Sequence, residues 1–143
     1  WYLANFIVDG IEYSSMEQYM MHQKALMFND NNIAEQIMNT TNVGKIKALG
    51  RSILNYNDTM WNGVRQVIVY KGLLEKFRQN SKLREQLLST GNDILAECAV
   101  QDIIWGIGLS MSDTKRYELE SWKGQNLLGF SLMLVRENLK NEL

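Results

Sequence analysis

The chain of 143 residues contains no proline, one cysteine and one histidine. Without proline, nothing in the sequence forbids long helices. The lone Cys98 excludes an internal disulfide framework and is typical of a reducing compartment. The lone His22 excludes a multi-histidine metal site and a Ser-His-Asp triad within one chain. We predict that His22 lies on a helix surface and that Cys98 is a small buried residue.

An excess of one charge and long apolar runs are also missing. Fifteen basic against sixteen acidic residues give a net charge of -1, so no basic field indicates nucleic-acid binding. No apolar run approaches the ~20 residues that a membrane-spanning helix needs, and the first residues do not resemble a signal peptide. Hydrophobic residues make up 45% of the chain and charged residues 22%, as in ordinary globular proteins. We therefore expect a cytoplasmic protein with no membrane partner.

Hydrophobic periodicity predicts a mainly α fold, a single compact helical domain over residues 1–143 with a minor β-hairpin. Asp9-Gly10 stands between two β-prone triplets, which indicates the hairpin. A serine, Ser14 or Ser15, is positioned to cap the first helix. We expect helices at about 16–28, 33–38, 40–53, 60–77, 81–88 and 124–139, a short strand at 94–99 and an irregular segment at 110–121.

Two segments that combine tryptophan with glycine carry the clearest functional signal. They are residues 102–109, with the sequence DIIWGIGL, and residues 122–129, with the sequence WKGQNLLG. Glycine lets the backbone approach a ligand, tryptophan offers a flat stacking face, and aspartate offers a charge. Together they predict the wall of a pocket for a flat, polar, sugar-bearing ligand. Either segment alone is more often a buried tryptophan beside a tight turn.

Two pairs of residues at helical spacing are further candidates. Glu17 and Lys24 are seven positions apart, nearly two turns, and therefore lie on one helix face. An exposed ion pair is the commoner meaning of this spacing, and an acid–base carboxylate beside a cation for an anionic ligand is the functional alternative. Trp61 and Arg65 are four positions apart and would suit a stacked base and a phosphate, although a core tryptophan with a solvent-reaching arginine is commoner.

A series of short motifs, in order along essentially the whole chain, resembles the NADAR family, also called YbiA-like. The motifs are Asn5-Phe6, Asp9-Gly10 to Tyr13, Ser15 to Tyr19, Gln23-Lys24-Ala25, Leu49-Gly50-Arg51, Trp61 with Arg65, Lys76-Phe77 with Asn80, Leu87 to Gly91, Glu97, and the two segments 102–109 and 122–129. The resemblance implies a mainly helical fold and an N-glycosidase connected with NAD and ADP-ribose metabolism.

The substrates implied by the resemblance are small ribosylated bases. Some family members cleave ribosylaminopyrimidine phosphates of the riboflavin pathway, and others remove ADP-ribose from guanine. The partner would therefore be a ribosylated base or an ADP-ribose adduct, with ADP-ribosylated nucleic acid as an alternative. The reaction needs no metal and no cofactor.

The catalytic candidates follow from the chemistry of this bond. Breaking it builds positive charge on the sugar, which a carboxylate can stabilise, or a carboxylate can activate water; Glu17 and Asp102 are the candidates. Lys24 can attack a ring-opened ribose to form a Schiff base, which requires a pKa lowered by burial or a nearby cation. We expect Glu17, Lys24, Asp102 and Trp105 to line one pocket.

The remaining candidates would bind the substrate. Trp61 and Trp105 would stack the base, Arg65 would meet a phosphate, Asn5 and Asn126 would hydrogen-bond sugar or base edges, and Gly106 would form part of the pocket wall.

Two other functions remain open from the sequence. A non-catalytic module that senses ADP-ribose or another nucleotide needs the same aromatic and glycine wall without a working carboxylate and lysine. A helical interaction domain would use all the conspicuous residues in its core. The presence of both Glu17 and Lys24 favours the enzyme.

Overall fold

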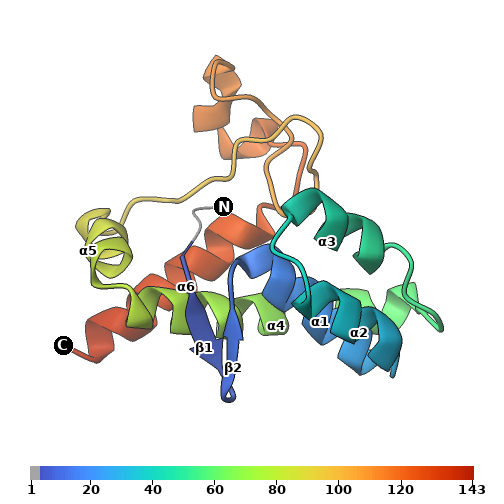
Figure 1. The fold of residues 1–143 in the computed structure, drawn as a ribbon. Helices are drawn as coiled ribbons and strands as arrows, with labels where there is room; N and C mark the ends of the chain where they lie inside the picture. The colour runs from blue at the N-terminus through green and yellow to red at the C-terminus, as the bar shows by residue number, and fades with distance from the viewer. Residues whose placement is uncertain (1–3) are drawn as a thin grey trace. The chain divides into compact units, whose positions relative to one another are not determined.

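A computed structural model describes residues 4–143, which form two compact units divided between Leu83 and Arg84. Figure 1 shows the helices and the hairpin of the chain, coloured from blue near the N-terminus to red at the C-terminus. The prediction of one domain over residues 1–143 stays a prediction. The mainly helical fold with one hairpin is confirmed, because the described residues hold six α-helices and a single two-stranded sheet.

The N-terminal unit begins with the predicted hairpin. Strands β1 (Phe6–Val8) and β2 (Ile11–Tyr13) pair antiparallel, with Phe6 opposite Tyr13. The turn residues Asp9 and Gly10 have φ angles of 51° and 81°, as a two-residue turn of positive φ requires. This register places Phe6 and Tyr13 on the buried face, with ring centroids 5.9 Å apart.

Four helices complete this unit, and a fifth continues across its boundary. They are α1 (Met16–Met27), α2 (Asn31–Met38), α3 (Val43–Gly50), α4 (Asp58–Gln79) and α5 (Ser81–Ser89). Helix α1 packs against α2, α3 and α4, and β1 lies against α4. The third helix stops at Gly50 rather than near residue 53. Ser15 is the cap of α1, since its side chain accepts a hydrogen bond from Gln18 N.

The contact between α1 and α4 depends on a tyrosine and a glycine. Tyr19 of α1 is buried, and its hydroxyl donates to Ile68 O at 2.8 Å. A Cβ at Gly72 would lie 2.4 Å from the Tyr19 ring. Glycine at this position therefore lets the two helices approach closely.

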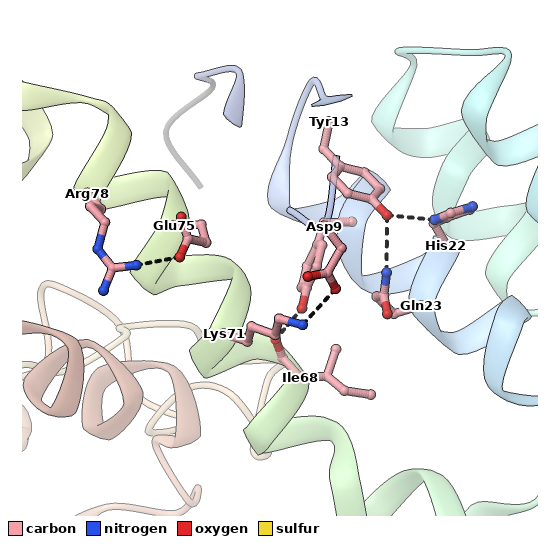
Figure 2. A network of polar contacts seen from close by, with 9 residues as sticks. Asp9, Tyr13, His22, Gln23, Ile68, Lys71, Glu75 and Arg78 are labelled. Atoms are coloured by element: carbon pink, nitrogen blue, oxygen red, sulfur yellow. Dashed lines mark hydrogen bonds and ion pairs between the residues drawn. The ribbon is translucent and has the colours of Figure 1, made fainter. Parts of the chain in front are cut away.

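His22 is buried rather than on a helix surface, so that prediction is wrong. Its side chain faces the hairpin, and Tyr13 Oη lies 2.8 Å from His22 Nδ1 (Figure 2). Gln23 Nε2 donates to the same tyrosine oxygen at 3.1 Å, which leaves the hydroxyl hydrogen for the imidazole. Burial lowers the pKa of His22, in agreement with a neutral ring that accepts this hydrogen bond.

The C-terminal unit consists of a long loop followed by α6 (Leu127–Asn141), with the short 3₁₀ turns Thr114–Tyr117 and Leu119–Ser121 in the loop. The strand predicted at 94–99 does not form. The Asn126 side chain instead bonds the backbone at Leu95 and Glu97, where a strand would need a neighbouring strand. Buried Arg136 fixes α6 by donating to Thr90 Oγ1 and Asp93 O, each at 2.8 Å.

Helix α6 begins three residues later than predicted. The amides of Gln125 and Asn126 donate to Ile103 O and Gly106 O, which ties this stretch to the preceding loop instead of to a helix. Asn126 has a left-handed backbone with a φ of 54°, which ends the irregular segment. Among residues 4–143, none of the helices combines the length and apolar character that crossing a bilayer requires.

Candidate functional site

Lys24 lies in a small polar and aromatic enclosure in the N-terminal unit. Its ammonium donates to Gly50 O at 3.1 Å, at the end of α3. The same nitrogen is 4.5 Å from the ring centroid of Tyr56 and 5.8 Å from that of Trp61. These three groups surround a cation with one carbonyl oxygen and two aromatic faces, all of which attract positive charge.

The pKa of Lys24 is lowered, as its predicted role as a nucleophile requires. Burial is the main cause; the nearby Asp58 carboxylate raises the pKa and the Arg51 guanidinium lowers it. A lysine whose charged form is disfavoured has a larger neutral fraction near pH 7 than an exposed one. The neutral amine is the form that can attack a carbonyl or imine carbon.

Glu17 stands in the first turn of α1, the helix that also carries Lys24, and is only 6% exposed. Its carboxylate oxygen lies 3.9 Å from Nζ of Lys47, an exposed residue of α3. The interpretation of Glu17 as half of an exposed surface ion pair is therefore wrong. Burying a carboxylate costs free energy, and such residues are enriched at functional sites.

The other site residues predicted in this unit have mixed surroundings. Trp61, in the first turn of α4, is buried with 6% exposure and faces Lys24. Arg65 is partly buried and donates to Asn62 Oδ1 at 2.8 Å. Asn5 is exposed and donates to Glu12 Oε1 of β2 at 3.3 Å. The structure therefore brings Lys24 and Trp61 together and places Asn5 beside the hairpin.

In the C-terminal unit, Asp102 and Gly106 shape one tight loop. Asp102 Oδ1 accepts hydrogen bonds from Ile104 N at 3.0 Å and Trp105 N at 2.8 Å. A Cβ at Gly106 would lie 2.8 Å from Asp102 O. One carboxylate oxygen of Asp102 thus orients the backbone around Trp105, and Gly106 permits the close backbone approach.

Asn126 has a structural role in this unit. Its side chain accepts from Glu97 N at 2.9 Å and donates to Leu95 O at 2.8 Å. The residue is completely buried, and the predicted contact of Asn126 with a sugar or base stays a prediction. The amide that looked suited to a ligand satisfies backbone groups of the loop instead.

A groove of about 320 Å³ also lies in the C-terminal unit, lined by Cys98, Arg116, Trp122 and neighbouring apolar side chains. Cys98 is only partly buried and faces this groove, so the expectation of a buried cysteine is wrong. Residues 4–143 contain no group of three His, Cys, Asp or Glu side chains that could hold a metal ion.

Sequence reasoning missed Gly50 and Tyr56 as partners of Lys24. Gly50 belonged to a motif, but its carbonyl oxygen rather than its small size contacts the lysine. Tyr56 lies between the helices predicted at 40–53 and 60–77, where no candidate residue was predicted from the sequence. Both groups reach Lys24 from other parts of the chain. Helical periodicity does not reveal such contacts.

Gly50→Ala is expected to destabilise the protein by about 1–3 kcal/mol, the usual cost of overpacking. An added Cβ would lie 2.1 Å from Met21 Sδ and 3.0 Å from its Cγ, so the buried Met21 side chain would have to leave its present position. Urea denaturation measures the loss of unfolding free energy. Gly63→Ala, at an α4 position where a Cβ meets nothing within 4 Å, is the control and should not destabilise. An unchanged stability of Gly50→Ala would contradict this packing.

The sequence profile of the NADAR domain matches residues 1–140. The chain belongs to the NADAR family. It is 42% identical to N-glycosidase R617 of Acanthamoeba polyphaga mimivirus, over 96% of this chain and 84% of that protein. It is 39% identical to Protein irg-1 of Caenorhabditis elegans, over 96% of this chain and 68% of that protein. The NMR structure of E. coli YbiA superposes with a TM-score of 0.80 at 30% identity, covering 98% of this chain and 75% of that one.

Proposed function

We propose that this NADAR protein is an N-glycosidase that hydrolyses the bond between ribose and the nitrogen of a base. The observation that carries the proposal is Lys24, a half-buried lysine with a lowered pKa, on the same helix as the buried carboxylate of Glu17. The similarity to relatives named N-glycosidase supports the reaction class. We also propose a cytoplasmic location, consistent with a single free cysteine.

In the proposed reaction, Lys24 is the nucleophile and Glu17 carries protons. When the ribose ring opens, C1′ becomes an imine carbon bonded to the nitrogen of the base. The neutral Lys24 amine adds to C1′, and the C1′–base nitrogen bond breaks as that nitrogen takes a proton and leaves. Water then hydrolyses the lysine imine, which releases ribose with a free C1′ aldehyde and restores the amine. Glu17 would transfer these protons between the amine, the base and water.

The proposed substrate is a ribosylaminopyrimidine phosphate or an ADP-ribosylated guanine, free or within nucleic acid. Trp61 would stack the base, and Arg65 would meet a phosphate. Trp105 remains a second proposed stacking residue, and Asp102 a second proposed carboxylate, in addition to its hydrogen bonds within the loop. No cofactor takes part in the proposed steps.

Incubation with a panel of N-ribosides tests this proposal. The panel contains a ribosylaminopyrimidine phosphate, ADP-ribosylguanosine and NAD, and mass spectrometry follows free base and free sugar. We expect release of the base from at least one of the first two, and incorporation of ¹⁸O from labelled water into the sugar aldehyde. Binding by calorimetry without release of any base would indicate a nucleotide-sensing module instead. If the protein neither binds a riboside nor releases a base, both functions are contradicted.

A further inference from the structure

Tyr56 is the aromatic residue nearest to the Lys24 ammonium among the contacts of the N-terminal unit. The distance from Lys24 Nζ to the Tyr56 ring centroid is 4.5 Å, against 5.8 Å for Trp61. Both distances are within the ~6 Å over which an aromatic face attracts a cation. Tyr56 lies in the segment between α3 and α4, and it belongs to none of the sequence motifs shared with the family.

The Tyr56 ring is held at both its edge and its hydroxyl. The hydroxyl donates to Asp58 Oδ1 at 2.6 Å, at the start of α4. Phe28, just after α1, packs edge-on against the ring with centroids 5.3 Å apart and an interplanar angle of 76°. Desolvation and the Asp58 carboxylate raise the pKa of Tyr56 to about 12, so the phenol stays neutral near pH 7. A neutral, fixed ring is suited to presenting its face to a cation.

We propose that Tyr56 is a positioning residue whose ring face, together with Trp61, holds the positive charge at Lys24 Nζ. In the free protein that charge is the Lys24 ammonium, and this role does not depend on any reaction. During turnover the charge is the protonated imine between Nζ and C1′ of the sugar, and this role rests on the proposed N-glycosidase function.

The role assigned to Tyr56 differs from that of the neighbouring charges. Burial lowers the pKa of Lys24 because it disfavours the ammonium. Among the nearby charges, the Asp58 carboxylate raises this pKa and the Arg51 guanidinium lowers it. The aromatic faces and Gly50 O supply local attraction for the cation at the point where it sits. Because a cation remains at nearly the same position when the imine is protonated, the enclosure stays matched to Nζ after covalent attachment of the sugar.

The first experiment measures the pKa of Lys24 in the free protein by NMR of labelled lysine, with Lys24→Arg used to assign the signal. Removing the ring in Tyr56→Leu should lower this pKa by about half a pH unit, the equivalent of an ordinary cation–π contact. Tyr56→Phe keeps the face and should leave the pKa within about 0.2 units of the original value. Tyr117→Leu, a tyrosine that is 78% exposed in the C-terminal unit, is the matched control and should change nothing. An unchanged or raised pKa in Tyr56→Leu overturns the proposal.

The second experiment measures turnover of whichever N-riboside the wild-type protein cleaves. Tyr56→Leu should lower kcat by about threefold to tenfold, and Tyr56→Phe should restore it to within about twofold. If Tyr56→Phe loses as much activity as Tyr56→Leu, the hydroxyl bond to Asp58 and not the ring is responsible, and the proposed role is wrong. If no riboside is cleaved by the wild type, the proposed function fails, while the pKa measurement still decides whether Tyr56 holds the Lys24 cation.

Discussion

Glu17→Gln is expected to lower the turnover of an N-riboside by about a hundredfold or more, the usual scale for losing an acid–base group. Glutamine keeps the size and hydrogen-bonding capacity of glutamate but can neither take up a proton nor stabilise a developing positive charge. The side chain is buried in the first turn of α1, where a charge acts on its surroundings more strongly than in water. Steady-state kinetics on the cleaved riboside measures the effect.

Stability separates this effect from a folding defect. The contact between Glu17 and the exposed Lys47 is long, at 3.9 Å, and ion pairs with an exposed partner contribute little to folding. Glutamine also keeps the size and hydrogen-bonding capacity of glutamate, so thermal unfolding of Glu17→Gln should resemble that of the wild type. Glu35→Gln removes an exposed carboxylate from α2 and should change neither activity nor stability. Normal turnover by a folded Glu17→Gln protein would exclude Glu17 from the mechanism.

Features governed by neighbouring residues could be predicted from the sequence. The Asp9-Gly10 pair gave the hairpin, because only a few residue types adopt two successive positive φ angles. The cap of α1, Ser15, accepts a hydrogen bond from the amide three positions on, so its signal is also local. The approximate positions of the helices could be predicted because helical periodicity is also a pattern among residues close in the sequence.

Features governed by distant contacts could not be predicted. The apolar residues at 94–99 suggested a strand, but the amide of Asn126, about 30 positions away, bonds their backbone. The burial of His22 depends on its contact with Tyr13 of the hairpin, which the spacing within the helix does not reveal. In both cases a single side chain from another segment decides the outcome, and periodicity contains no information about it.

The candidate site divides in the same way. Glu17 and Lys24 could be selected because one helix carries both, and helical spacing fixes their shared face. The partners of Lys24 come from three other places, the end of α3, the segment before α4 and the first turn of α4. Only Trp61 among them was chosen from the sequence. The common pocket predicted for Glu17, Lys24, Asp102 and Trp105 stays a prediction.

Borohydride added during turnover is expected to trap a covalent sugar adduct on Lys24. Hydride reduces the C=N bond between C1′ and Nζ to a secondary amine, which no longer hydrolyses, and peptide mass spectrometry locates the modified residue. The lowered pKa of Lys24, caused mainly by burial, makes the neutral amine available near pH 7. Raising the pH toward the pKa of Lys24 should increase the trapping rate, because the neutral fraction rises.

Lys24→Arg keeps the charge beside Gly50 O and the two rings but cannot form the imine, because a guanidinium stays protonated. This variant should still bind the riboside by calorimetry, lose turnover and give no adduct. Lys45→Arg, at an exposed position of α3, should be trapped at Lys24 like the wild type. If borohydride traps nothing and Lys24→Arg turns over normally, Lys24 is only an electrostatic anchor for the substrate. Direct attack by water, assisted by Glu17 or Asp102, would then be the mechanism that accounts for cleavage.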